Sequence, residues 1–264
     1  MIGVPTANTL LGRLLRFPLR LVPDGRPLRI LTGPLAGKRW ISTSATHGCW
    51  LGTYESELQR LFVSSLRPGD VFFDVGANVG FFTLLGSALV GPHGRVVAFE
   101  PLPGNVALLR ENLELNGVAN TTVIPAAVAE TPGTGMLSES SSSSQGSLGN
   151  EGVTVPLVAL DALLAEGTIP SPSVMKVDVE GAESRVLAGA RTLLSKSRPL
   201  IFLSTHGIRQ HQACWSYLAG IGYELRLRRD GSADGQYESV ATHRASVDGQ
   251  PFRGRPHRAN RVVK

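Results

Sequence analysis

The chain has 264 residues, of which 42% are hydrophobic and 18% are charged, as expected for one ordinary globular domain with extended ends. Its net charge of +5 is concentrated at the ends, since residues 1–40 hold seven basic and one acidic residue and residues 249–264 hold five basic and none acidic. Residues 41–248 hold 14 basic and 20 acidic residues, whereas a nucleic-acid enzyme more often carries a basic patch beside its active site, so no nucleic-acid partner is expected.

Residues 1–45 are expected to form an N-terminal extension. Arg13, Arg16 and Arg20 recur at the spacing of one helical face, with leucines on the opposite face. A basic amphipathic pattern of this kind within residues 10–22 favours either packing on the protein's own domain or weak contact with a membrane surface. The alternatives stay open at this point.

The cellular setting follows from the apolar runs and the cysteines. No run of eighteen apolar residues occurs, so no transmembrane segment is expected. The two cysteines, Cys49 and Cys214, are too few for a disulfide framework and lack the spacing of a metal site. We therefore expect a reducing, cytoplasmic location and predict no metal site from the cysteines.

Residues 46–230 are expected to form the main domain, after a short hairpin across Leu28–Ile41 in the extension. The apolar pattern alternates between buried strands and helices, which is typical of an α/β, Rossmann-like, doubly wound sheet with mostly parallel strands. The predicted strands are 71–75, 95–99, 121–126, 153–157, 174–178, 200–203 and 222–228; the predicted helices are 55–65, 79–89, 103–116, 160–165, 183–195 and 208–220.

Two segments interrupt or follow this alternation. Ser138–Ser147 is rich in serine and is expected to be a flexible loop or the edge of a lid. Residues 231–264 are expected to form a polar, basic tail, with one edge strand near Glu238–Thr242.

The turn between the first core strand and its helix carries the strongest functional signal. Its sequence, Asp74-Val-Gly-Ala-Asn-Val-Gly80, places glycines where a ligand can approach the backbone. A dinucleotide-binding turn needs three glycines in the pattern G-x-G-x-x-G, and here Asp74 and Val79 take two of those places. An acidic residue there suits a ligand with positive charge and no phosphate. S-adenosylmethionine fits this description, and the alternative is a tight turn without a ligand.

Glu100 strengthens the ligand hypothesis, because it ends the next predicted strand. In doubly wound sheets an acidic residue at that place binds the ribose hydroxyls of a nucleotide-like ligand. Ligands of such sheets lie at the carboxyl ends of the strands, where Asp178 is also expected.

Three segments together resemble the FkbM family of S-adenosylmethionine-dependent methyltransferases, which belong to class I. They are Val71–Leu85, Phe99-Glu100-Pro101 and Lys176–Glu183, and Trp50–Glu55 is similar to the segment that leads into the family's domain. The resemblance extends from about residue 32 to about residue 227. The first segment is general to class I enzymes. The presence of both Lys176–Glu183 and Trp50–Glu55 in one chain is more specific to the FkbM family.

The resemblance implies a cofactor site. Asp74, Gly76, Asn78 and Gly80 would surround the methionine part of S-adenosylmethionine, and Glu100 would bind its ribose. Glu55 lies just before the core and is a further candidate, either closing over the cofactor beside Tyr54 or starting the helix that follows. Asn105 and Asn116 are left out of the site.

The catalytic candidates follow the fourth and fifth core strands. Lys176, Asp178 and Glu180 alternate along one strand and so share one face. A buried lysine needs an acidic partner, so Asp178 is expected either to pair with Lys176 or, with Glu180, to orient or deprotonate the acceptor. His206 follows the next strand and is a candidate general base, since histidine titrates near neutral pH.

Two departures from the family's pattern affect this interpretation. Many relatives have an acidic residue near the adenine, where this chain has Ala126–Ala129. Many also have Glu-x-His where this chain has Ser204-Thr205-His206, so a paired acid–base or metal role there is weakened. A metal-dependent mechanism that uses Asp178 and Glu180 remains an open alternative.

The leading hypothesis is therefore a methyltransferase that uses S-adenosylmethionine to methylate a hydroxyl on a small molecule, sugar or lipid. One alternative is a methyltransferase-like binding module without turnover. Another is a nicotinamide-dependent oxidoreductase, which the incomplete glycine pattern argues against. The sequence indicates no particular oligomeric state.

Overall fold

The computed structural model describes residues 22, 25–139, 146–148, 152–231 and 234–245. Its centre is a sheet of seven strands in the order β12-β13-β11-β10-β3-β4-β5. The strands are β3 (Val71–Val75), β4 (Arg95–Phe99), β5 (Thr121–Ile124), β10 (Val174–Val177), β11 (Leu200–His206), β12 (Tyr223–Asp230) and β13 (Gln236–His243). The five strands from β11 to β5 are parallel, and β13 is antiparallel to β11 and β12.

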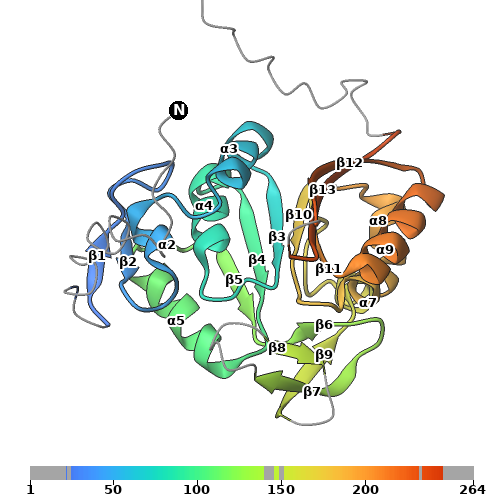
Figure 1. Ribbon diagram of the computed structural model, residues 1–264, viewed down its shortest axis with the longest axis horizontal. Coiled ribbons are helices and arrows are strands. Elements are labelled where there is room, and N and C mark those ends of the chain that lie inside the picture. The colour runs from blue at the N-terminus through green and yellow to red at the C-terminus, as the bar shows by residue number, and fades with distance from the viewer. Residues whose placement is uncertain (1–21, 23–24, 140–145, 149–151, 232–233, 246–264) are drawn as a thin grey trace, which may run out of the picture.

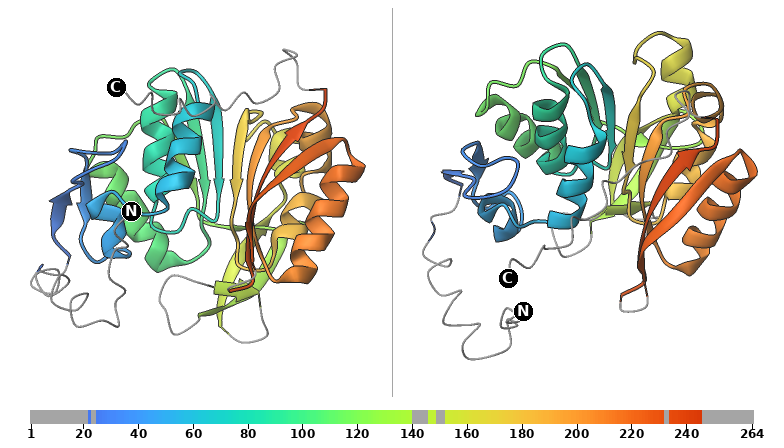
Figure 2. Two further views of the ribbon diagram at one scale, coloured as in Figure 1. Left: turned by 45° about the horizontal axis from the view of Figure 1, so that its top comes forward. Right: turned by 90° about the horizontal axis from the view of Figure 1, so that it is seen from above.

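Helices cover both faces of this sheet (Figures 1 and 2). Side chains along β3 alternate between the two faces, so Phe72 joins one apolar cluster and Phe73 the other. The first face is covered by α3 (Ser56–Ser65), α4 (Phe81–Val90) and α5 (Pro103–Glu114), and the second by α6 (Leu160–Ala165), α7 (Glu183–Ala188), α8 (Arg191–Lys196) and α9 (Ile208–Gly220). The expected doubly wound α/β architecture is confirmed. Within the described ranges, no helix is long and apolar enough to cross a membrane.

The N-terminal extension packs beside α5 through two asparagines. The expected hairpin forms from β1 (Pro27–Arg29) and β2 (Arg39–Ile41), and α2 (His47–Leu51) follows it. The Asn112 side chain accepts a hydrogen bond from the Ile41 amide and donates one to the Val79 carbonyl, each 3.0 Å long. Asn116 binds both backbone polar groups of Arg39. The basic pattern at residues 10–20 lies outside the described residues.

A second, smaller sheet interrupts the α/β alternation, in the region where the sequence predicts a serine-rich loop. It has the order β6-β9-β7-β8 and lies beside the carboxyl ends of the central strands (Figure 1). Its strands are β6 (Ala127–Val128), β7 (Gly133–Glu139), β8 (Gly146–Leu148) and β9 (Val153–Val158). Only β9 is expected from the sequence, and residues 140–145 lie outside the described ranges.

Two expectations for the C-terminal half are wrong. The strand near Glu238–Thr242 is not an edge strand, because β13 is paired on both sides, with β11 and with β12. Residues 236–243 are therefore part of the central sheet rather than of a polar tail. The helix expected over 183–195 is divided into α7 and α8 at Gly189, where a Cβ atom would lie 2.1 Å from the Ala129 carbonyl oxygen.

We expect Asn112→Ala to destabilise the protein by about 2 kcal/mol, because it leaves the buried Ile41 amide and Val79 carbonyl without their partner. Glu114→Ala, an exposed position on the same helix, is the control and should change the free energy of unfolding by less than about 0.5 kcal/mol. Urea denaturation of both variants measures the difference. Equal stabilities would show that Asn112 does not anchor the extension.

Candidate active site

The predicted glycine turn joins β3 to α4 and presses against the end of β10. Gly76 has a φ of 82°, and a Cβ atom there would lie 1.9 Å from the Asp178 carbonyl oxygen. Only glycine fits this close approach. Gly80 has a different function, since a Cβ atom there would meet the Leu109 side chain at 3.0 Å. Gly80 therefore allows α4 and α5 to pack closely and does not line the pocket described below.

Glu100 ends β4 and points its carboxylate back toward the turn. Its Oε2 accepts a hydrogen bond from the Asn78 amide at 2.9 Å, while its Oε1 accepts from the Leu102 amide at 3.0 Å and from Asn105 Nδ2 at 3.1 Å. Burial raises the pKa of Glu100, and these three donors oppose the rise. Asn105, which the sequence analysis leaves out of the site, therefore positions Glu100 from the first turn of α5.

Asp74 is fully buried at the end of β3. Its Oδ2 accepts a hydrogen bond of 2.6 Å from Thr83 Oγ1, whereas its Oδ1 has no hydrogen-bond partner among the described residues. Burial raises the pKa of this carboxyl, and the charge of Lys176 opposes the rise. A buried oxygen without a donor is costly, so the site favours a ligand that supplies a donor or a positive charge.

Lys176 lies buried in β10 and pairs with Asp178, as the sequence predicts. Their Nζ and Oδ2 atoms are 2.9 Å apart. Burial pulls the pKa of Lys176 down, but the charges of Asp178, Asp74 and Glu55 outweigh it and leave the pKa above its ordinary value. Burial likewise raises the pKa of Asp178, and Lys176 outweighs that effect and lowers it. The pair is therefore ionised.

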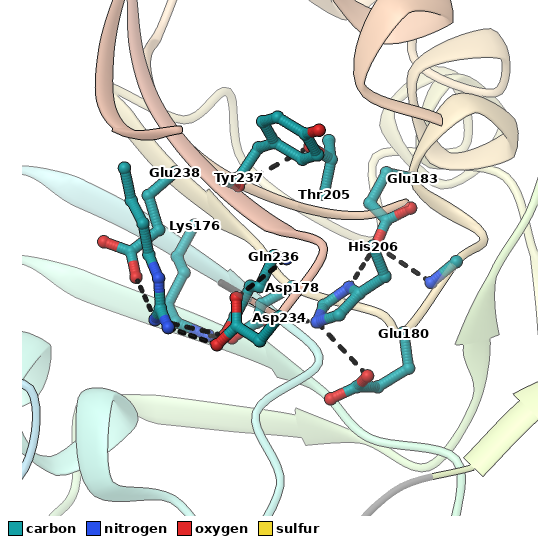
Figure 3. Close-up of polar contacts among 12 residues, drawn as sticks. Lys176, Asp178, Glu180, Glu183, Thr205, His206, Asp234, Gln236, Tyr237 and Glu238 are labelled. Atoms are coloured by element: carbon teal, nitrogen blue, oxygen red, sulfur yellow. Dashed lines mark hydrogen bonds and ion pairs between the residues drawn. The ribbon is translucent and has the colours of Figure 1, made fainter. Parts of the chain in front are cut away.

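His206 ends β11 and meets three carboxylates (Figure 3). Its Nδ1 lies 2.8 Å from Glu183 Oε1, and its Nε2 lies 3.2 Å from Glu180 Oε2 and 4.0 Å from Asp178 Oδ1. Burial lowers the pKa of His206, but the hydrogen bond that it donates to Glu183 and the nearby charges raise the pKa above the ordinary value. Both ring nitrogens thus face acceptors. A base needs a free lone pair at Nε2, so the base role of His206 stays a prediction.

Glu183 is the residue whose contribution sequence reasoning missed. It begins α7, as expected, but its side chain is 0% exposed and turns inward to His206. The same Oε1 atom accepts a hydrogen bond of 2.9 Å from the Gly181 amide. Because this oxygen acts as an acceptor, the His206 Nδ1 carries the proton that joins them.

One pocket of about 370 Å³ brings most of the predicted residues together. Seven of the nine predicted site residues line it: Glu55, Asp74, Gly76, Asn78, Glu100, Asp178 and Glu180. Gly80 does not line it, and His206 lies behind Glu180 and Asp178. The end of the extension and the segment that follows it also reach this pocket, through Ala45, Thr46 and Cys49.

The part of the pocket beyond Glu100 is apolar. Leu102, Ala126, Val128 and Leu137 line it, the last of these from β7 of the small sheet. No side-chain carboxylate other than Glu100 lies among the described lining residues of this part, which include Ala126, Ala127 and Val128. An apolar slot of this kind suits a flat, aromatic ligand group.

We expect Asp178→Asn to lower the free energy of unfolding by about 3 kcal/mol, because it leaves the buried Lys176 without its charged partner. Asp234→Asn is the matched control. It breaks an exposed ion pair with Arg229 and should cost less than about 1 kcal/mol. Thermal and urea unfolding of both variants test this, and an Asp178→Asn protein as stable as the control would contradict the assigned pairing.

Comparisons with known proteins identify the family of this chain. The family model of the methyltransferase FkbM domain matches residues 74–225. The hexuronic acid methyltransferase AglP of Haloferax volcanii is 34% identical over 150 residues, which cover 53% of this chain and 58% of that protein. The 31-O-demethyl-FK506 methyltransferase FkbM of Streptomyces tacrolimicus is 33% identical over 159 residues, which cover 47% of this chain and 60% of that one.

The chain spans about three fifths of the length of these two curated relatives. The crystal structure of methyltransferase FkbM from Methylobacillus flagellatus KT superposes on this one with a TM-score of 0.51 and 18% sequence identity. The match covers 75% of this chain and 56% of that chain, and it supports the fold. The matched family segment contains Asp74, Glu100, Asp178 and His206. This chain belongs to the family defined by the methyltransferase FkbM domain.

Proposed function

We propose that this methyltransferase uses S-adenosylmethionine to methylate a hydroxyl group on a small molecule, a sugar or a lipid. The observation that carries the proposal is the pair of buried carboxylates at one pocket, Glu100 with its ordered donors and Asp74 with an oxygen that lacks a partner among the described residues. A cationic, ribose-containing ligand matches both.

The residues fit the parts of this cofactor. A carboxylate has about four acceptor positions, and three of those of Glu100 are used, so capacity remains for a ribose hydroxyl. The carboxylate of Asp74, which is buried in the wall of the pocket, suits the ammonium group or the sulfonium charge. The apolar slot with Leu102 and Leu137 suits the adenine ring. When bound, the cofactor supplies a methyl group that its sulfonium has already activated.

The chain's own residues then have two tasks. They must hold the acceptor oxygen in line with the methyl group and exclude water, because alignment is the main source of rate in such a displacement. They must also take up the hydroxyl proton as the oxygen forms its bond to carbon. Asp178 and Glu180 line the pocket, with His206 directly behind them, and we assign both tasks to this cluster.

The names of the relatives support an oxygen acceptor on a sugar or small molecule. AglP is named for a hexuronic acid, and the Streptomyces enzyme is named for an O-methylation site on FK506. Thr46 and Cys49, which follow the extension, and Gln236 of β13 also line the pocket, and we expect such residues to set the choice of acceptor.

We expect the purified protein to bind S-adenosylmethionine with saturation and to bind NAD more weakly. The free Asp74 carboxylate oxygen attracts the charges of the former and repels the pyrophosphate of the latter. Isothermal titration calorimetry with both ligands measures the two affinities. Tighter binding of NAD would reject the cofactor assignment.

We expect Glu100→Gln to weaken S-adenosylmethionine binding at least about tenfold, since a charge-assisted hydrogen bond contributes about 1.5–3 kcal/mol. Glutamine keeps the shape of the side chain but opposes one backbone amide with its own NH2 group, so the melting temperature should fall while the protein stays folded. Glu111→Gln, an exposed change of the same kind on α5, is the control and should bind as the unaltered protein does. Equal affinities in the two variants would remove Glu100 from the site.

A further inference from the structure

We propose that Asp178, Glu180 and His206 bind one divalent metal ion at the acceptor side of the pocket. The inference deepens the proposed function and rests on it for the role of the ion, but the site can be tested independently. In this proposal the three side chains act together as metal ligands, rather than as an ion pair or as a single general base.

The ligand atoms already lie close to one another. Asp178, Glu180 and His206 each offer one ligand atom, and these three atoms lie within 4.8 Å of one another. The nitrogen is 3.2 Å from the Glu180 oxygen and 4.0 Å from the Asp178 oxygen. Neighbouring ligands of a metal with bonds of about 2.1 Å lie roughly 3 Å apart, so only the Asp178 oxygen needs to move closer.

A second set of buried groups orients these ligands. Glu183, which is 0% exposed, holds His206 Nδ1 at 2.8 Å, so the ring presents Nε2 to the cluster (Figure 3). Lys176, itself buried, holds Asp178 Oδ2 at 2.9 Å, so that carboxylate presents Oδ1. Metal-binding histidines characteristically donate their second nitrogen to a carboxylate in this way. A surface ion pair would not require a fully buried carboxylate behind the ring.

The charges around the cluster also favour a dication. Asp74, Asp178, Glu180 and Glu183 approach one lysine, Lys176, and one histidine. One oxygen of Asp74 and one of Glu183 lack hydrogen-bond partners in the described part of the chain. Arg229 lies nearby, but its charge is already paired with Asp234 and Glu238. The negative charge at this edge of the sheet is therefore only partly compensated.

The donor set and its exposure indicate the kind of ion. Two carboxylate oxygens suit Mg²⁺ and Mn²⁺, and an imidazole nitrogen suits Zn²⁺ and other transition metals, so Mn²⁺ satisfies both. The side chains of Asp178, Glu180 and His206 are 19%, 30% and 23% exposed, which leaves room for further ligands. Because Asp178 and Glu180 line the pocket, the ion would bind the acceptor's hydroxyl oxygen and make its proton easier to remove.

The site can be tested by titrating Mn²⁺ into the purified, chelator-treated protein in the absence of S-adenosylmethionine. Electron paramagnetic resonance measures the Mn²⁺ that remains free. We expect one saturable site. Glu180→Gln and His206→Asn each remove a ligand and should weaken binding at least about tenfold, and Glu183→Gln, which removes the support of the histidine, should weaken it about 10–100-fold. Asp234→Asn removes a nearby carboxylate outside the cluster and should bind Mn²⁺ normally.

Absence of saturable binding of Mn²⁺, Zn²⁺ and Mg²⁺, or equal binding by Glu180→Gln and the Asp234→Asn control, would overturn the metal site. Melting temperatures verify that each variant is folded. S-adenosylmethionine affinity, measured on the same samples, separates the two proposals. If it stays normal while metal binding fails, the cofactor proposal stands; if the unaltered protein binds the metal but no S-adenosylmethionine, the proposed function is the one that fails.

Discussion

A buried lysine organises the carboxyl edge of this sheet. Lys176 lies in the central strand β10, in register with Asp74 of β3, and an isolated ammonium group there would be very costly. Asp178 compensates it directly, and the charges of Asp74 and Glu55 add to the compensation. The ion pair thereby ties together the end of β10, the start of the glycine turn and the segment before α3. The shape of the pocket depends on all three.

The same edge gathers more negative than positive charge, and this imbalance links structure to chemistry. Parallel strands end together, so carboxylates that follow different strands converge without any contact in sequence. Such convergence opposes folding unless cations or donors compensate it. Glu100 is satisfied by backbone amides and Asn105, whereas Asp74 keeps one oxygen without a partner among the described residues. The fold thus retains part of its electrostatic cost at the place where a cationic ligand would relieve it.

Elements outside the α/β core complete the pocket. The N-terminal hairpin is fixed to α5 by Asn112 and Asn116, and this attachment carries Thr46 and Cys49 to the pocket. The small sheet contributes Leu137 from the opposite side. These additions lie around the doubly wound core, so under the proposed function they are suited to determine which acceptor enters the pocket, and the core would bind the cofactor.

Local sequence determined much of this protein. Continuous apolar runs predict β3 and β4, the pattern of α9 predicts its bounds, and the period of two in β10 predicts that Lys176 pairs with Asp178. Each of these signals depends on residues a few positions apart. Only the tertiary structure decided that β13 lies between β11 and β12, because strand pairing over long separations leaves no local pattern. The contact between Glu183 and His206, which lie 23 residues apart, is likewise decided by the tertiary structure. The start of α7 lies beside the end of β11, and this brings the two side chains together.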